Sequence, residues 1–370
     1  MKELFLRYKA ERDVVFVLGA GASHPDGVPL QKHLLPTILS GGIEEIENSE
    51  IGKRVIEFIT DNFVYSPQKN QYPQLEAVFG FIDYFIQQNE SLSSKYTLSY
   101  IIELKEYLIK LIHYIVNLQT DKNSKYYHLF WQGIANNNKN ISIITLNYDT
   151  LLEQAFEFLF KKTGYIDYCF HLMNYDKTDN LKRFNFWINP REPVPVENNN
   201  NPAPFKIVKI HGSLNWKYCN CCNQILLTPW DRKIDLQRGK FLGYTYPDMQ
   251  EYEYRCPLDG TEFQTLIMPP SYVKSLKQPV INQLLSEASR EIRIAKKIVF
   301  VGYSLSDADV HVKALFQKQI NPDTKIIVVN TRNSDTLKNK YYSLSKNINF
   351  MNCAFEEMVS NPDIMPELLK

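Results

Sequence analysis

ISIITLNYDT, residues 141–150, is an apolar run that stops abruptly at polar side chains. In an open α/β sheet, ligands bind at the carboxyl ends of the strands, so a buried strand followed at once by Asn147 and Asp149 predicts a binding site. Asn147 can hold a water or a ribose hydroxyl. Asp149 can accept from hydroxyls, or it can serve only as the N-cap of a helix that runs to about Phe160.

A similar junction lies upstream, where VVFVLG (14–19) predicts a buried strand and the loop GAGAS (19–23) follows. Glycine has no Cβ, so backbone N–H groups between Gly19 and Ser23, that of Ala20 included, could approach a pyrophosphate at a helix start. The third glycine of the standard dinucleotide fingerprint is absent. A purely structural turn is the alternative.

A third junction follows KIVKI (206–210), a predicted strand that ends at His211. An imidazole in this position suits general-base work on a ribose hydroxyl or water. We therefore predict a nucleotide pocket with a candidate catalytic amide, Asn147, and a candidate catalytic imidazole, His211. The other histidines, His311 included, are expected to be surface or core residues, with His24 beside the glycine loop a weaker candidate.

The fourth junction is VGYS (301–304), where Gly302 and Ser304 can face a nucleotide ribose. Asp307 and Asp309 follow, and one or both can be mere helix-start carboxylates favoured by the helix dipole. The flanking pattern predicts a final β-α-β unit, which would close a parallel sheet. Its predicted elements are a helix at 279–297, a strand at 298–302, a helix at 307–317 and a strand at 325–330.

These elements predict an α/β fold: a Rossmann-like parallel sheet flanked by helices, with a large helical insertion and a small cysteine-containing module. Apolar residues recur at helical spacing from Leu75 to Ile86 and from Ile101 to Leu118, which indicates the insertion. The predicted parts are a core at 1–29, 137–216 and 265–370, the insertion at 30–136 and the cysteine module at 217–264.

The cysteine module contains one C-x-x-C pair, Cys219 and Cys222, and a second half-pair in which Asp259 stands where the last cysteine of a zinc ribbon belongs. Cys219, Cys222, Cys256 and Asp259 are candidate zinc ligands. Cys221 used in place of one of them is an alternative. A degraded ribbon that folds without metal is another.

Composition excludes several classes of protein. The net charge is +1 and no long basic run occurs, so nothing favours direct binding of nucleic acid. No stretch is apolar enough for a membrane span, and six cysteines in 370 residues do not make a disulfide scaffold. We expect a cytoplasmic, soluble protein.

The four junctions resemble the SIR2 (sirtuin-like) superfamily. Sirtuins carry a GAG-[AI]-S loop, a T-Q-N-x-D segment, an H-G and a late glycine–serine loop. Here GAGAS (19–23), TLNYD (145–149), HG (211–212) and VGYS (301–304) follow in the same order. TLNYDTLLE, KIHGSLNW, MPPSY (268–272) and VGYSLSDAD are similar to the bacterial branch found in anti-phage defence proteins.

This resemblance implies an NAD hydrolase (NADase) that cleaves NAD to nicotinamide and ADP-ribose. It implies that Gly19, Ala20, Gly21 and Ser23 contact NAD, that Asn147 and His211 are catalytic, and that Asp149, Gly302 and Ser304 help seat the nucleotide. Control is expected from homo-oligomerisation or from a separate partner, a HerA-like ATPase or an Argonaute-like protein.

Two departures bear on the reaction. Sirtuin deacylases place G-I-P-D-F-R after the glycine loop, whereas Gly27-Val28-Pro29-Leu30 loses the Asp, Phe and Arg. The F-G-E strand that pairs with an acyl-lysine peptide has no counterpart between Cys256 and Lys274. Hydrolysis is therefore favoured. An NAD-dependent protein deacylase and a non-catalytic module that binds NAD or ADP-ribose are the alternatives.

Overall fold

The computed structural model describes residues 2–120, 123–159, 163–173, 187–189, 192–197, 201–228, 234–244, 250–274, 276 and 278–370. The chain forms two compact units. The sheet unit comprises Met1–Val28, Lys122–Gly212 and Lys277–Lys370, and the helical unit comprises Pro29–Asp121 and Ser213–Leu276. The finer division into a core, an insertion at 30–136 and a cysteine module at 217–264 stays a prediction.

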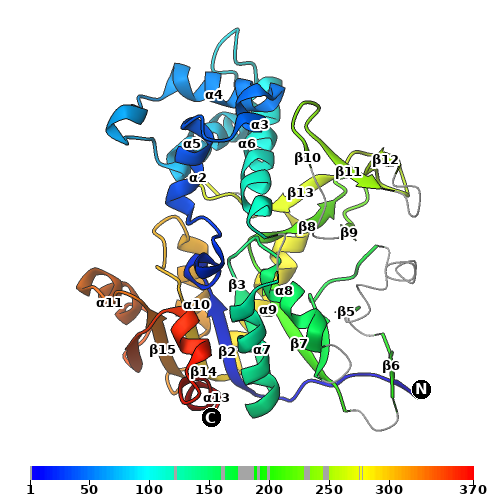
Figure 1. Cartoon of the computed structure of the whole chain (residues 1–370), viewed down its shortest axis with the longest axis vertical. Helices are drawn as coiled ribbons and strands as arrows, with labels where there is room; N and C mark the ends of the chain where they lie inside the picture. Colours follow the sequence, from blue (N-terminus) through cyan, green and yellow to red (C-terminus); the bar gives the residue numbers. More distant parts are fainter. Residues whose placement is uncertain are drawn as a thin grey trace. The chain divides into compact units, whose positions relative to one another are not determined.

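An eight-stranded sheet forms the centre of the sheet unit, with the order β16-β15-β14-β2-β3-β7-β4-β5 (Figure 1). All its neighbouring strands are parallel. The strands are β2 (Arg12–Leu18), β3 (Ile141–Thr145), β4 (Gly164–Asp167), β5 (Trp187–Ile188), β7 (Ala203–Lys209), β14 (Ala295–Val301), β15 (Lys325–Asn330) and β16 (Ile348–Asn352). The predicted α/β class with a parallel sheet is confirmed.

Helices cover both faces of this sheet, which is why its central strands are nearly continuous apolar runs. On one face, Phe130 and Trp131 of α7 (Lys125–Asn137) pack against Phe16 of β2 and Phe205 of β7. On the other face, α9 (Pro279–Arg293) packs against β2, β7 and β14. The remaining helices of this unit of eight residues or fewer are α1 (Ala20–Ser23), α8 (Leu151–Phe156), α11 (Asp335–Tyr342), α12 (Phe355–Ser360) and α13 (Ile364–Leu369).

Two predicted helices begin later than the sequence indicated. The helix after VGYS is α10 (Val310–Gln319), not 307–317, because the loop continues through Leu305, whose φ is +50°, to Asp309 as the N-cap. The helix after TLNYD is α8, whose N-cap is Thr150 rather than Asp149. It ends at Phe156 and a 3-10 turn (Glu157–Leu159) follows, while Phe160 lies outside the described residues.

The helical unit contains α2 (Gln31–Leu39), α3 (Glu44–Asn48), α4 (Glu50–Asn62), α5 (Leu75–Gln88) and α6 (Leu98–Leu118). Ser49 and Thr97 cap α4 and α6, since each hydroxyl accepts from a backbone N–H of the first turn. The same unit has two small sheets, β13 (Gln264–Ile267)-β8 (Gly212–Tyr218)-β9 (Ile225–Leu227) and β10 (Ile234–Asp235)-β11 (Lys240–Tyr244)-β12 (Glu251–Glu253). Among the described helices, none is long and apolar enough to cross a membrane.

Candidate functional site

The four predicted junctions lie on four neighbouring strands. In the order β14-β2-β3-β7, the strands lead into VGYS, GAGAS, TLNYD and IHG, respectively. Because the strands are parallel, all four loops leave the sheet on the same side, at the carboxyl ends of the strands. From β2, the chain adds β3 and β7 on one side of that strand. It later adds β14, β15 and β16 on the other side. The boundary between β2 and β14 is therefore a topological switch point, where open α/β sheets bind their ligands.

Glycines bring the loops after β2 and β14 into direct backbone contact. The N–H of Gly19 donates to the carbonyl of Val301 (3.0 Å), and that of Gly21 donates to the carbonyl of Gly302 (2.9 Å). A Cβ on Gly21 would lie 2.8 Å from the Cα of Gly302, and a Cβ on Gly302 would lie 2.6 Å from the N of Ala22. Two N–H groups expected to face a pyrophosphate thus hold the loops together, so the glycines serve loop packing.

The helix after the glycine loop is a single turn. Ala20 opens α1 half-buried, and a 3-10 turn (His24–Asp26) follows directly. A dipole of one turn is weak, so any phosphate here would depend on hydrogen bonds rather than on a long helix. Ser304 of the neighbouring loop is exposed.

Asn147 is tied to the glycine loop through its amide nitrogen. Its Nδ2 donates to the carbonyl of Gly19 (2.9 Å) and to the hydroxyl of Ser23 (3.0 Å). A carbonyl only accepts, so Gly19 fixes the orientation of the amide and leaves Oδ1 as the atom that can accept from a ligand. The fully buried Ser23 hydroxyl also lies 2.9 Å from that of Tyr127, a contact the sequence pattern did not reveal.

Asp149 is buried beneath this network. Its Oδ1 accepts from the N–H of Leu151 (3.2 Å), so the carboxylate helps to cap α8 although Thr150 is the N-cap. Burial raises its pKa, and the charge of Lys209 opposes that rise. Lys209 itself pairs with buried Glu153 (2.9 Å). Asp149 thus has a structural role whether or not it also contacts a nucleotide.

His211 is 5% exposed and lies at the end of β7 beside two residues from the start of α10. Its Nε2 is 3.1 Å from Nε2 of His311 and 3.7 Å from Oδ1 of Asp309. The ring of Tyr148 is also near, with centroids 6.4 Å apart. From the sequence, His311 is expected to be a surface or core residue, and Asp309 can be only a helix-start carboxylate. The D-x-H spacing of Asp309 and His311, separated from VGYS by four residues, was the one available signal.

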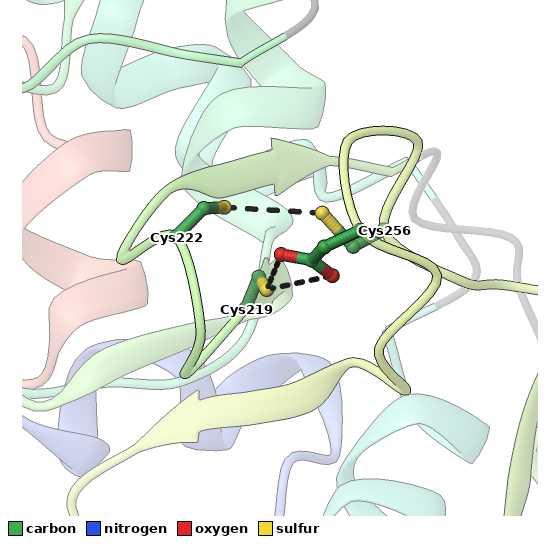
Figure 2. A group of neighbouring side chains, drawn as sticks. Cys219, Cys222 and Cys256 are labelled. Atoms are coloured by element: carbon green, nitrogen blue, oxygen red, sulfur yellow. Dashed lines mark hydrogen bonds between the residues drawn. The ribbon is translucent and has the colours of Figure 1, made fainter.

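The four candidate zinc ligands come together in the helical unit. Figure 2 shows Cys219, Cys222 and Cys256 converging from two loops. The Sγ atoms of Cys222 and Cys256 are 3.8 Å apart, and Sγ of Cys219 is 3.4 Å from Oδ2 of Asp259. Zn–S bonds of about 2.3 Å give a tetrahedral S···S edge of about 3.8 Å, so the set fits a zinc ion. Exposed Cys221 is not part of this group.

A family model described as SIR2-like domain matches residues 141–351, more than half of the 370-residue chain. The chain belongs to the SIR2-like domain family. The match spans Asn147, His211, the cysteine group and the VGYS loop, and it begins after GAGAS. The predicted SIR2-like membership is confirmed.

Solved Sir2 structures are similar over nearly the whole chain. A complex of a Sir2 homologue with NAD is 13% identical with a TM-score of 0.45, and the match covers 97% of this chain and 89% of that one. A mutant Sir2 homologue bound to ADP-ribose is 14% identical with a TM-score of 0.44, covering 97% and 92%. Among curated proteins, none matches this chain.

Proposed function

We propose that this SIR2-like protein is an NAD glycohydrolase. One observation carries the proposal: a half-buried amide, Asn147, and a buried imidazole, His211, follow adjacent parallel strands at the edge where the glycine loop also lies. Membership of the SIR2-like family supports NAD as the nucleotide. In the reaction, the bond between nicotinamide and ribose C1′ breaks, its electron pair leaves with nicotinamide, and water adds to C1′ to give ADP-ribose and a proton.

Each residue has a part in this proposal. The ribose becomes cationic as the bond breaks, as in other glycosyl transfers. Oδ1 of Asn147 would position the water or a ribose hydroxyl, and His211 would accept the proton. The loop of Gly19, Ala20, Gly21 and Ser23 would lie beside the phosphates and the adjoining ribose, while the N–H groups of Gly19 and Gly21 stay in the contact with the VGYS loop. Asp149, Gly302 and Ser304 would help to seat the rest of the nucleotide.

One observation favours a second candidate, an NAD-dependent protein deacylase. The interval between Cys256 and Lys274 holds strand β13 at the edge of a three-stranded sheet. An edge strand can take up an extended peptide by strand addition. The test is to incubate the protein with NAD, with and without acyl-lysine peptides, and to separate the products by chromatography. ADP-ribose formed without peptide supports hydrolysis, whereas O-acyl-ADP-ribose formed only with peptide supports deacylation.

We also propose a structural zinc ion held by Cys219, Cys222, Cys256 and Asp259. Bound there, zinc would cross-link the loops before β9 and after β12 and contribute to folding. No step of NAD cleavage is assigned to it.

Finally, we propose that the protein is a cytoplasmic, NAD-depleting effector of anti-phage defence. The proposal is supported by the resemblance of its four loops to that branch. Unchecked NAD cleavage is lethal, so activity would be restrained through homo-oligomerisation or a HerA-like ATPase or Argonaute-like partner. The helical insertion would be the assembly face, and Tyr84, Ile102 and Leu118 are exposed on its helices. Native mass spectrometry that finds only monomers, alone and with such partners, would contradict this.

A further inference from the structure

His211, Asp309 and His311 form a cluster of metal-ligating side chains in the sheet unit. One ligand atom of each, two imidazole nitrogens and one carboxylate oxygen, lies within 4.8 Å of the other two. His211 comes from the end of β7, whereas Asp309 and His311 come from the N-cap and first turn of α10. This group is separate from the cysteine group, which belongs to the helical unit.

The distances suit a small tetrahedral ion. Zn–N and Zn–O bonds of about 2.0–2.1 Å give a ligand-to-ligand edge of about 3.3 Å. The measured separations of Nε2 of His211 from its two neighbours, 3.1 Å and 3.7 Å, lie on either side of that value. These two contacts could close onto one ion with shifts of a few tenths of an ångström at side-chain ends, and the third separation, between His311 and Asp309, is within 4.8 Å.

A further contact orients the carboxylate. The hydroxyl of buried Tyr303 donates to Oδ2 of Asp309 (3.0 Å), which leaves Oδ1 directed at His211. Protein metal sites commonly hold a ligating carboxylate through such a second partner. An ion could enter from solvent, because His311 is half-exposed and Val310 beside it is 68% exposed.

We propose that His211, Asp309 and His311 bind one divalent transition-metal ion of the zinc type. Two imidazoles and a carboxylate with one open position are a known zinc ligand set. The positive end of α10 opposes a cation, but a helix dipole acts far more weakly than coordination by imidazole and carboxylate ligands.

Metal binding would switch the candidate active site off. The ion would take the lone pair of His211 Nε2, so this nitrogen could not accept a proton during NAD hydrolysis. The metal-loaded protein would therefore be restrained and the metal-free protein active. This consequence rests on the proposed NAD hydrolase function, whereas metal binding itself does not.

The test is a Co²⁺ titration of the chelator-stripped full-length chain without NAD, followed by absorbance and equilibrium dialysis. Co²⁺ bound by thiolates gives strong near-ultraviolet charge-transfer bands, and Co²⁺ bound by nitrogen and oxygen does not. We expect one equivalent of Co²⁺ without those bands, in addition to any equivalent with those bands that the cysteine group binds. Binding confined to a thiolate-type spectrum in the wild-type protein would overturn the proposal, and the two histidines would then share only a hydrogen bond.

Variants assign the site. His311→Gln and Asp309→Asn should each weaken this equivalent by more than about 100-fold, and Tyr303→Phe by about 10–100-fold. Exposed His33→Gln is the control and should bind as the wild type does. Unfolding curves establish that each variant is folded, and undiminished Co²⁺ affinity in folded His311→Gln and Asp309→Asn would contradict the assignment. If NAD is hydrolysed, Zn²⁺ should inhibit the wild type. Zn²⁺ bound at the site without loss of activity would overturn the inhibition alone.

Discussion

Gly302 is the residue on which the contact between the VGYS and GAGAS loops depends most. Its φ is +61°, and a Cβ would meet the backbone N of Ala22 at 2.6 Å. Gly302→Ala should therefore lower the free energy of unfolding by about 2 kcal/mol or more, since both backbone strain and a backbone clash are added. Urea denaturation of the wild type and the variant measures this difference in the free energy of unfolding.

The matched control is Gly260→Ala. Gly260 also has a positive φ, +75°, but a Cβ there meets nothing within 4 Å. Gly260→Ala should therefore lower the free energy of unfolding only by the left-handed backbone strain, about 1 kcal/mol. Equal losses in the two variants would mean that the loop contact adds nothing to stability.

Lys217 is a second residue with a testable cost. Burial brings its pKa to about 7, although its Nζ donates to the carbonyl of Leu214 (2.7 Å) and lies 4.0 Å from the ring centre of Phe241. Between pH 10.5 and about 7 the unfolded chain holds a proton that the folded protein lacks, so stability falls as the pH is lowered through this window and then levels off.

Lys217→Met removes this dependence. Its stability gain over the wild type should grow from pH 10 down to pH 7, to less than about 5 kcal/mol, and stay constant below. Chemical denaturation at a series of pH values measures the difference. A gain that does not change with pH would show that Lys217 stays charged in the folded protein.

The candidate catalytic residues were predictable because each directly follows an apolar strand in the sequence. Asn147 and His211 needed only local pattern and the rule that parallel strands share one functional edge. His311 and Tyr127 did not follow from such a pattern. They lie 100 and 104 residues from the side chains they contact, His211 and Ser23, and local periodicity carries no signal over such separations.

A buried ionic network joins α9 to three strands of the sheet. Glu291 of α9 is fully buried and pairs with Arg12 of β2 (2.8 Å) and Lys206 of β7 (2.8 Å), and it accepts from Ser142 of β3 (2.6 Å). Burial raises the pKa of Glu291, but the two cations bring it below its ordinary value. The network therefore stabilises the fold fully at pH values above the ordinary pKa of a glutamate. This stabilisation is lost as the pH falls and Glu291 takes up a proton.

Glu291→Gln leaves two buried cations without this charge partner. It should lower the free energy of unfolding at pH 7 by about 3–5 kcal/mol, and the difference should shrink in acid as wild-type Glu291 takes up a proton. The control is Glu50→Gln on α4, whose exposed pair with Arg54 should contribute less than about 0.5 kcal/mol. Similar effects of both changes would contradict the importance of burial.

Zinc binding by the cysteine group should depend on Cys256. Cys256→Ser should remove bound zinc from the purified protein and lower its melting temperature, because one of four ligands is lost. Cys221→Ser, which changes an exposed neighbour outside the group, should keep one zinc per chain. Metal analysis by mass spectrometry measures the zinc bound per chain in the two variants. Loss of zinc from Cys221→Ser alone would make Cys221 the ligand.

The elements themselves were predicted unevenly. The strand at 325–330 was predicted to the residue, since KIIVVN is bounded by polar residues. The start of α10 was misplaced because aspartates favour both loops and helix starts, and the left-handed turn at Leu305 leaves no mark in the sequence. Glu291 likewise belongs to an amphipathic helix, and nothing local indicates that it faces Lys206.

For the whole molecule, all residues of the candidate NAD site lie in the sheet unit, whereas the cysteine group lies in the helical unit. Both units are assembled from separated stretches of the chain, and the predicted core and cysteine module likewise keep these two groups of residues apart. Fold class and family followed from four short loops, since their order along the chain and their places on the sheet agree. Assembly did not follow, because exposed apolar residues name no partner.

NAD hydrolysis that depends on His211 is tested by the initial rate of NAD loss catalysed by the purified chain and by His211→Ala, with nicotinamide and ADP-ribose quantified together. We predict peptide-independent, equimolar products from the wild type. The rate should fall by about 10²–10⁴-fold in the variant, which removes a positioned base. Wild-type turnover that is unchanged in folded His211→Ala would contradict the catalytic role of His211.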